Sequence, residues 1–449
     1  MTSETLIPTP ISVPWDDKQL EAIDACCDTT KRIVCVSGPA GSGKTKIIEE
    51  VNRRLKGAGY IVQASAPTGK AAKRINEATG LHAMTNHRML GYGMPIEHDE
   101  VDEKTGDTKK VLISTGPTYH QRNRFPYDVI ACDEYMMVNT TINRELINAM
   151  KDGSRILCFG DENQLKPIEE GRYERGKEPP PPFLLSLNNP KITGIRLDTI
   201  HRTGEGSGIA KNAKAILAGR FPSRAPDFDL CVTDQPVKLL QELVRDKLQQ
   251  GIDFSKTYAQ IITPQNKSWT GTIKLNGVLQ SLFWERSLPP FDLPRRPVYN
   301  ADRRKSEPAG YLRVQVGTKV VYTANTYDMG DGQSVFNGEV GIVVDIDHDI
   351  GIVSVDFGDR VVGIPPLVIY ETTDGTKEMN PHMHIDLAYA LTTHKMQGSE
   401  CPHVVVVLNR SMLFTESRRN FYTAVSRSRE HCTVITDQVS LTKSVRNPD

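Results

Sequence analysis

The sequence has few aromatic residues, no surplus of either charge and no long apolar run. Aromatic residues are 6% of its 449 residues, and 55 basic residues balance 55 acidic ones. That balance disfavours a protein that binds nucleic acid through bulk positive charge, although a local groove can still hold a strand. No apolar run approaches the roughly 18 residues of a membrane span, so we expect no membrane partner.

The cysteines show no metal-binding or redox spacing. The eight cysteines form no C-x-x-C pair, and Cys35, Cys132 and Cys158 lie inside apolar runs. Buried, reduced cysteines of this kind disfavour a zinc site and a disulfide framework, and they indicate a reducing compartment. Residues 1–10 also lack the basic start and apolar core of a secretory signal. We therefore expect a cytoplasmic protein, located in a host cytoplasm if a phage encodes it.

Short apolar runs alternate with helical stretches in the first part of the chain. Strands are expected at residues 32–36, 60–66, 129–133 and 155–160, with helices at 44–56, 70–78 and 143–150. This order is typical of a parallel sheet covered on both faces, whose ligands bind at the carboxyl ends of the strands. A second α/β pattern begins near Ile209 and has candidate strands at residues 259–263, 387–392, 404–408 and 432–436.

Two segments interrupt these α/β patterns. Residues 94–127 contain a Thr105-Gly106-Asp107 turn signal after an acidic stretch, which predicts an inserted β-hairpin. Residues 317–365 are rich in Val, Ile and Gly with two-residue alternation, as in a small antiparallel barrel. We therefore predict a first domain at 1–205 with the hairpin at 91–127, a β insertion at 316–381, and a second domain at 206–315 and 382–449.

The most specific motif is a phosphate-binding loop. Gly38-Pro39-Ala40-Gly41-Ser42-Gly43-Lys44-Thr45 matches G-x-x-x-x-G-K-[ST], follows an expected strand and opens an expected helix. Glycines let backbone N–H groups converge on phosphate oxygens, and the helix N-terminus adds the positive end of its dipole. Lys44 is then expected to reach the β- and γ-phosphates of ATP, and the Thr45 hydroxyl to ligate Mg²⁺.

A pair of acids follows the third of these strands. Asp133 and Glu134 end the run Ala131-Cys132-Asp133-Glu134. Alone, two acids after a strand are usually helix caps or solvent-facing residues. With a phosphate-binding loop upstream, we expect Asp133 to bind Mg²⁺ and Glu134 to be the general base for an attacking water. The chain is therefore predicted to bind and hydrolyse a nucleoside triphosphate.

Three further motifs resemble one family of nucleotide hydrolases. They are Gly160-Asp161-Glu162-Asn163-Gln164-Leu165-Lys166-Pro167, then residues 390–400 (ALTTHKMQGSE), then residues 420–429 (NFYTAVSRSR), and no guanine-reading N-K-x-D is present. Together with the phosphate-binding loop they resemble superfamily 1 DNA helicases of the 5′→3′ branch, RecD-like or phage Dda-like, over residues 15–436. The resemblance implies that Gln164 senses the γ-phosphate and that Arg427 is an arginine finger.

The resemblance implies roles for other residues too. Gln19 corresponds to the glutamine that reads adenine, and Arg202 to an arginine that contacts the γ-phosphate. Residues implied to contact DNA are Pro67, Thr68 and Gly69 after the second strand, His87, and Thr393, His394 and Lys395. Taken alone, Thr68 is equally well a helix cap and His87 a structural hydrogen-bonding residue.

The resemblance finally implies a fold and an activity. The fold is two RecA-like parallel-sheet motor domains, with the hairpin as a strand-separating pin and the β insertion as an SH3-like module. The activity is ATP- and Mg²⁺-dependent 5′→3′ translocation on single-stranded DNA and unwinding of forked duplex. We expect a monomer that works with replication or recombination proteins. The alternatives are opposite polarity, RNA preference, a solvated hairpin with no role, and an ATP-binding accessory subunit that does not unwind.

Overall fold

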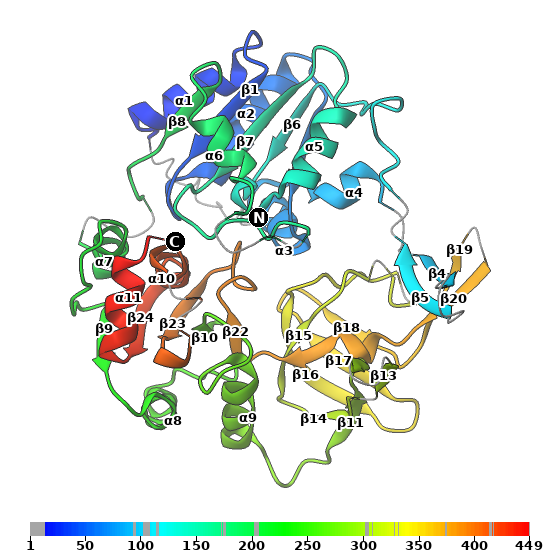
Figure 1. Cartoon of the computed structure of the whole chain (residues 1–449), viewed down its shortest axis with the longest axis vertical. Coiled ribbons are helices and arrows are strands. Elements are labelled where there is room, and N and C mark those ends of the chain that lie inside the picture. Colours follow the sequence, from blue (N-terminus) through cyan, green and yellow to red (C-terminus); the bar gives the residue numbers. More distant parts are fainter. Residues whose placement is uncertain are drawn as a thin grey trace, which may run out of the picture.

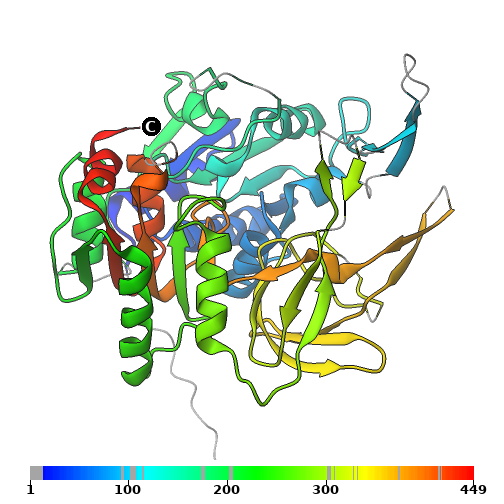
Figure 2. The same cartoon turned by 60° about the horizontal axis from the view of Figure 1, so that its bottom comes forward.

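The computed structural model describes residues 14–92, 96–101, 108–113, 116–171, 173, 177–201, 206–300, 305–307, 309–326, 328–330, 332–372, 375–412, 415 and 417–448. Two α/β units lie one above the other, and an antiparallel β module lies beside them (Figure 1). The second view keeps this arrangement, with the β module still to one side of both units (Figure 2). No helix in the described part of the chain combines the length and apolar character needed to cross a bilayer.

The first α/β unit is built on a six-stranded sheet in the order β3-β2-β6-β7-β1-β8. Every neighbouring pair is parallel, as the alternating sequence pattern predicts. The strands are β1 (Ile33–Ser37), β2 (Val62–Ala66), β3 (Met84–Thr85), β6 (Val129–Cys132), β7 (Arg155–Gly160) and β8 (Thr193–Arg196).

Helices cover both faces of this sheet because β1 is apolar on both. Val34 and Val36 pack with the helices α1 (Asp17–Cys27) and α2 (Lys44–Gly57). Cys35 points the other way and belongs to a second cluster that includes α5 (Thr140–Ala149). The other helices are α3 (Gly69–Thr79), α4 (Asn86–Leu90), α6 (Pro182–Leu187) and the short 3-10 turn η1 (Tyr135–Met137).

The second α/β unit has a five-stranded sheet in the order β22-β10-β23-β24-β9. All its pairs are parallel. Its strands are β9 (Phe228–Val232), β10 (Ala259–Thr263), β22 (Ala390–Thr392), β23 (Cys401–Val407) and β24 (Ser428–Thr436). Its helices are α7 (Gly208–Leu217), α8 (Pro236–Gln249), α9 (Thr272–Phe283), α10 (Arg418–Val425) and α11 (Gln438–Arg446), with the 3-10 turn η3 (Arg410–Met412).

The β module is a five-stranded antiparallel sheet in the order β18-β17-β16-β15-β21. Its strands are β15 (Lys319–Tyr322), β16 (Val340–Asp347), β17 (Ile352–Asp356), β18 (Val361–Ile364) and β21 (Ile385–Leu387). Because β21 pairs with β15, this sheet extends past the predicted boundary at residue 381. The single strand expected at residues 387–392 is therefore two strands: β21 ends in the β module, and β22 begins the edge of the second parallel sheet.

Four two-stranded pairs lie outside these sheets. The segment expected to form a hairpin contains β4 (Ile96–Val101) and β5 (Thr108–Ile113), which pair antiparallel. The Thr105-Gly106-Asp107 turn that joins them lies outside the described residues. The other pairs are β11 (Phe291–Pro294) with β14 (Tyr311–Val314), β12 (Val298–Asn300) with β13 (Lys305–Glu307), and β19 (Val368–Thr372) with β20 (Gly375–Met379).

Candidate nucleotide site

The loop between β1 and α2 forms a cradle of backbone groups. Gly41 and Gly43 have φ values of 84° and 88°, which side chains other than glycine rarely adopt. A Cβ on Gly43 would lie 2.5 Å from Nε2 of Gln19, and one on Gly38 would lie 2.5 Å from Oγ of Ser42. Glycine is therefore needed both for the turn and for the close approach of its neighbours.

Lys44 and Gln19 both bond to this loop. Nζ of Lys44 donates to the carbonyl oxygens of Gly38 and Pro39 at 2.6 and 3.0 Å. Nε2 of Gln19 donates to the carbonyl oxygen of Ser42 at 3.0 Å, while its Oε1 accepts from the backbone N–H of Asp16. Each end of the Gln19 amide thus has one partner within the protein, which leaves its second N–H and the second lone pair of Oε1 for a ligand.

The two acids lie at the carboxyl end of β6, at the mouth of the same cavity. Asp133 and Glu134 are 8% and 7% exposed. Among the described residues, Glu134 is the one non-glycine residue with positive φ, at 51°, a conformation that costs roughly 1 to 2 kcal/mol. Burial, and then the charge of Glu134, raises the pKa of the Asp133 carboxyl to about 6. A cation bound there would be favoured by the same crowding of negative charge.

Gln164 follows the carboxyl end of β7 and is 3% exposed. Its Nε2 lies 3.4 Å from Oδ2 of Asp161, and its Oε1 has no hydrogen-bond partner among the described residues. A buried carbonyl oxygen without a donor carries a free-energy penalty that a bound water or ligand can remove. Gln164 is therefore placed to accept a hydrogen bond from something in the cavity.

Arg427 comes from the second unit, after α10, and is only 1% exposed. Its guanidinium donates to the Thr423 carbonyl at 3.0 Å, the Ser399 carbonyl at 3.3 Å and the Ser426 hydroxyl at 3.0 Å. These bonds fix the planar group, and it forms part of the wall of the cavity that contains Lys44. Arg202, the other arginine expected here, lies outside the described residues.

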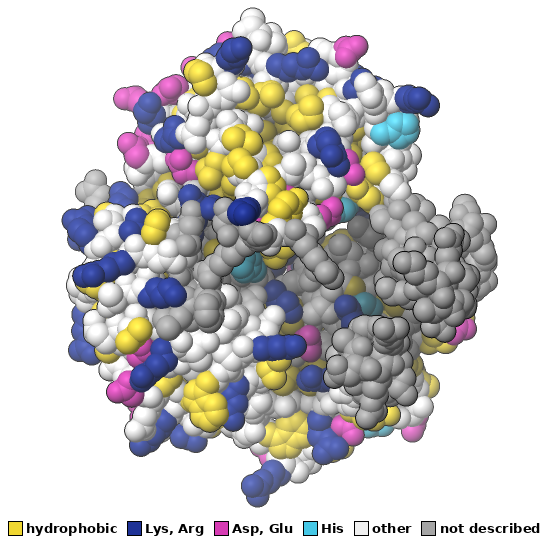
Figure 3. Space-filling view, in the orientation of Figure 1, with side chains coloured by type: hydrophobic (Ala, Val, Ile, Leu, Met, Phe, Trp, Pro, Cys, Tyr) yellow, Lys and Arg dark blue, Asp and Glu magenta, His cyan; other side chains and the backbone are white. Residues whose placement is uncertain are grey.

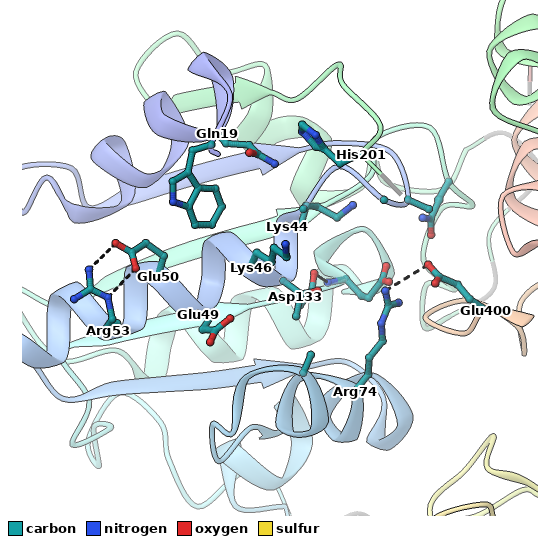
Figure 4. A pocket seen from close by; sticks show the side chains of 18 of the residues that line it. Gln19, Lys44, Lys46, Glu49, Glu50, Arg53, Arg74, Asp133, His201 and Glu400 are labelled. Carbon is teal, nitrogen blue, oxygen red and sulfur yellow. Dashed lines mark hydrogen bonds and ion pairs between the residues drawn. The ribbon is translucent and has the colours of Figure 1, made fainter. Parts of the chain in front are cut away.

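The cavity has a volume of about 610 Å³ and is bounded by both α/β units. Lys44, Thr45, Asp133, Glu134 and Gln164 line it from the first unit, and Glu400 and Arg427 from the second. Figure 4 shows Arg74, from α3, and Glu400 pointing toward one another across one end. Their ion pair spans 3.4 Å and links the two units beside the two acids.

The residues present fit a magnesium nucleotide. The glycine-rich cradle and Lys44 suit phosphate oxygens, and the free Oε1 of Gln164 suits a water. Magnesium in such sites keeps several waters and takes one or two protein oxygens besides the phosphates, a number that Thr45 and Asp133 can supply. The described residues contain no cluster of three or more His, Cys, Asp or Glu that could hold a metal by themselves.

The residues expected to contact DNA are in two groups, one after the neighbouring strands β2 and β3 and the other after the edge strand β22. Thr68 caps α3, its hydroxyl accepting from the N–H of Ala71 at 3.2 Å, and Gly69 lies against the ring of Phe336 from the β module. His87 is exposed on α4, with its ring 5.2 Å from that of Tyr92.

The second group follows β22 and needs one correction. His394 and Lys395 are half-buried, but Thr393 is fully buried and its hydroxyl donates to Oδ1 of Asn420 at 2.8 Å. The Thr393 side chain was expected on the DNA side and instead fastens β22 to α10, because the strand ends beneath that helix.

The sequence interpretation missed several residues that the fold brings to the cavity. Arg74 and Glu400 form its far end, and Trp15 and His201 lie on its near side. Glu400 stands inside a recognised motif, so its position could have been singled out. Arg74 carries no motif of its own, and only the docking of α3 beside the acids brings it there.

Tyr422 joins the two units behind the cavity. Its hydroxyl donates to Oδ2 of Asp161 at 2.7 Å, and both groups are buried. Burial raises the pKa of Asp161 above its usual range, while Lys44 and the Tyr422 hydroxyl pull it down. The N–H of Leu165 also donates to the hydroxyl of Thr423 at 3.1 Å. Helix α10 is therefore bonded directly to the loop that carries Gln164.

Comparison with known proteins matches both units. A sequence profile described as an AAA domain matches residues 14–229, and one described as a UvrD-like helicase C-terminal domain matches residues 387–435. The ATP-dependent RecD2 DNA helicase of Deinococcus radiodurans is 28% identical over 404 residues, or 89% of this chain and 46% of that protein. The chain is therefore similar to superfamily 1 helicases of the RecD type.

Further similar proteins align over most of the chain. The RecBCD enzyme subunit RecD of Mycolicibacterium smegmatis is 26% identical, covering 90% of this chain and 68% of the subunit. The chain thus spans about half the length of this RecD2 and about two thirds of this RecD. In fold, Bacteroides Pif1 helicase in complex with ADP-AlF3 and ssDNA superposes with a TM-score of 0.58 at 18% identity, covering 97% of this chain and 94% of that one.

Proposed function

We propose that this chain is an ATP-dependent DNA helicase that moves 5′→3′ on single-stranded DNA and unwinds the duplex ahead of it. The observation that carries the proposal is the composition of one cavity. Lys44, Asp133 and Glu134 reach it from one parallel-sheet unit, and Arg427 reaches it from the other. The relatives' names agree with this activity, since they include an ATP-dependent DNA helicase and a helicase in complex with single-stranded DNA.

Each residue has a role in hydrolysis that its position supports. The loop at 38–43 and Lys44 hold the phosphates, and Gln164 orients a water through its free Oε1. Glu134 accepts a proton from that water while the water oxygen bonds to the γ-phosphorus. The bond between the γ-phosphorus and the bridging oxygen of the β-phosphate breaks in the same step. Thr45 and Asp133 would hold Mg²⁺, which when bound would supply positive charge beside the phosphates. Arg427 stabilises the charge on the phosphates from the second unit.

Motion follows from the two-sided construction of the site. ATP carries negative charge that attracts Arg427 and so favours closure of the two units, and hydrolysis weakens that attraction. Bonds from α10 to the loop 161–165 pass the change from one unit to the other.

The DNA path is assigned to the carboxyl ends of β2 and β3 in the first unit and of β22 in the second. Pro67, Thr68 and Gly69 follow β2, His87 follows β3, and His394 and Lys395 follow β22. β3 and β22 are the edge strands of their sheets. A strand that crosses both edges is held alternately by the two units as they open and close.

The accessory parts receive the family's roles within this proposal. The β4–β5 pair is the strand-separating pin, and the sheet β15–β18 with β21 is an SH3-like module. Lys73 of α3 forms ion pairs with Glu339 and Asp359 of that module at 3.2 and 2.6 Å, which supports a mechanical link between the module and the motor. The protein acts as a monomer on forked DNA, where replication or recombination proteins also work.

A comparison of tailed duplexes tests the proposal. A duplex with a 5′ single-stranded tail should be unwound in the presence of ATP and Mg²⁺, and the same duplex with a 3′ tail should not. Lys44→Ala is the matched control, because it removes the phosphate contact and should abolish unwinding of both substrates. Faster unwinding of the 3′-tailed duplex overturns the polarity. ATP binding without unwinding of either substrate favours an accessory subunit.

A further inference from the structure

The loop between β10 and α9 carries an exposed aromatic residue that the proposed mechanism does not use. Trp269, in the loop, is 65% exposed, and Ile273, in the first turn of α9, is 61% exposed. The chain has only three tryptophans, and tryptophan is buried on average. Two large apolar side chains this exposed and this close together mark an interaction surface better than a chance exposure does.

The charge around Trp269 has one sign. Nζ of Lys274 lies 5.3 Å from the centre of the indole ring, and Lys267 is exposed in the same loop. No aspartate or glutamate occurs from residue 254 to residue 284. This local bias stands out in a chain of zero net charge, whose basic side chains are scattered over the face seen in Figure 3. An exposed indole ring with an ammonium group over one face and a second exposed lysine in its loop suits an anionic ligand with flat rings.

A groove runs from this loop along α9. It is lined by Lys267, Ser268, Ile273, Lys274 and Gly277, among others. Gly277 lies within the helix, where glycine costs stability, and a Cβ there would meet no atom within 4 Å. The hydroxyl of Ser268 has no partner among the described residues. The groove is therefore open beside Gly277.

The position of the loop connects it to the DNA path. β10 and β22 are parallel neighbours with Thr263 opposite Thr392 (Figure 1), and the N–H of Thr393 donates to the carbonyl of Thr263 at 3.1 Å. The loops that leave these strands therefore emerge at the same edge of the sheet. One loop carries His394 and Lys395, and the other carries Trp269.

We propose that Trp269 is a base-stacking platform for single-stranded DNA, with Lys267 and Lys274 on the flanking phosphates. It extends the path from His394 and Lys395 across the second unit. Stacking is indifferent to base identity, which suits a translocating protein, and the groove beside Gly277 gives the backbone room to pass. This inference rests on the proposed function, because it needs a strand in that path.

Binding of oligo-dT of 15 nucleotides to the full chain tests the platform. Trp269→Ala should raise the dissociation constant roughly 5- to 150-fold, the range expected for loss of one stacked base. Trp269→Phe keeps a ring and should lose less. Tyr311→Ala is the matched control, because it removes another exposed aromatic, 71% exposed, on β14, which is not a strand of the β10 sheet. It should leave the dissociation constant unchanged.

Two further readouts separate stacking from a general loss of fold. Binding should quench tryptophan emission in the wild type, and the Trp269→Phe variant should lose that quenching. Lys274→Gln should reduce the slope of log affinity against log salt by about 0.7 for one phosphate contact on a single strand. At saturating DNA the ATP turnover of Trp269→Ala should equal that of the wild type, since this residue is remote from the nucleotide cavity.

The outcomes distinguish the two proposals. If the wild type binds oligo-dT and Trp269→Ala binds it equally well, the platform is refuted while the helicase assignment stands. If the wild type shows neither binding of oligo-dT nor DNA-stimulated ATP hydrolysis, the helicase assignment is refuted, and the platform that rests on it is refuted too. If oligo-rU binds more tightly than oligo-dT with the same dependence on Trp269, the assignment to DNA is overturned.

Discussion

The bond between Tyr422 and Asp161 provides a sharp test of communication between the two units. Tyr422→Phe deletes one hydroxyl that lies behind the nucleotide cavity and leaves every residue lining that cavity in place. After the change, Oδ2 of Asp161 keeps only the weak contact with Gln164 at 3.4 Å. The carboxylate is 1% exposed, so water does not readily replace the lost donor.

The magnitude follows from the burial of that carboxylate. Leaving a buried acceptor without its donor costs about 1 to 3 kcal/mol, and charged groups lie at the upper end. A loss of about 2 kcal/mol corresponds to roughly a 30-fold change in the equilibrium for closure of the units. Loss of the Tyr422 hydroxyl also removes a donor that lowers the Asp161 pKa, so that pKa should rise further above its usual range.

ATP turnover at saturating single-stranded DNA is the assay, with Tyr135→Phe as the matched control. The Tyr135 hydroxyl is buried too, and it donates to Oδ1 of Asn143 at 2.8 Å within the first unit. Both variants should unfold at a lower temperature than the wild type. Only Tyr422→Phe should lose ATP turnover, by about 10-fold or more if closure limits the rate.

Two results would refute this reasoning. Equal losses of turnover in Tyr422→Phe and Tyr135→Phe would assign the effect to stability alone. Wild-type turnover in Tyr422→Phe would show that the bond between the units has no part in closing the site around Gln164.

Two other predictions concern stability and coupling. Burial lowers the pKa of Lys319 to about 8, so the buried charge destabilises the folded state in full below pH 8 and progressively less as pH rises toward 10.5. Lys319→Met, which also loses the 2.6 Å bond to the Ala259 carbonyl, should therefore raise the unfolding free energy by about 2 kcal/mol at pH 7. Equal gains in unfolding free energy at pH 7 and pH 10, measured by urea unfolding, would contradict this. Lys73→Met removes the ion pairs to Glu339 and Asp359 and should lower the number of base pairs unwound per ATP, while ATP turnover stays near that of the wild type. An unchanged number of base pairs per ATP would contradict a mechanical link between the β module and the motor.

Much of the phosphate site was predictable because its chemistry is local. The φ values of Gly41 and Gly43, the cradle between β1 and α2, and the acids at the end of β6 all follow from short contiguous motifs. The parallel sheets were predictable for a similar reason, since alternating apolar runs and helices leave few topologies open.

Features that depend on docking between distant segments were not predictable. Arg74 reaches the cavity only because α3 packs beside the acids, and Gly69 meets Phe336 only because the β module lies against that helix. Thr393 stands in a motif associated with DNA, yet its hydroxyl is used to join β22 to α10. A motif gives the position of a residue in the chain, whereas the direction of its side chain depends on what packs over it.

The measurement that tests the central claim most directly is ATP hydrolysis by Arg427→Ala with nucleotide binding measured in parallel. If the site is completed by the second unit, turnover should fall about 10³-fold or more, while binding of nucleotide to the loop around Lys44 persists. Thr423→Ala, which changes the neighbouring contact to Leu165 and keeps the guanidinium, serves as the control and should lose far less. Turnover by Arg427→Ala within 10-fold of the wild type would contradict a nucleotide held between two units.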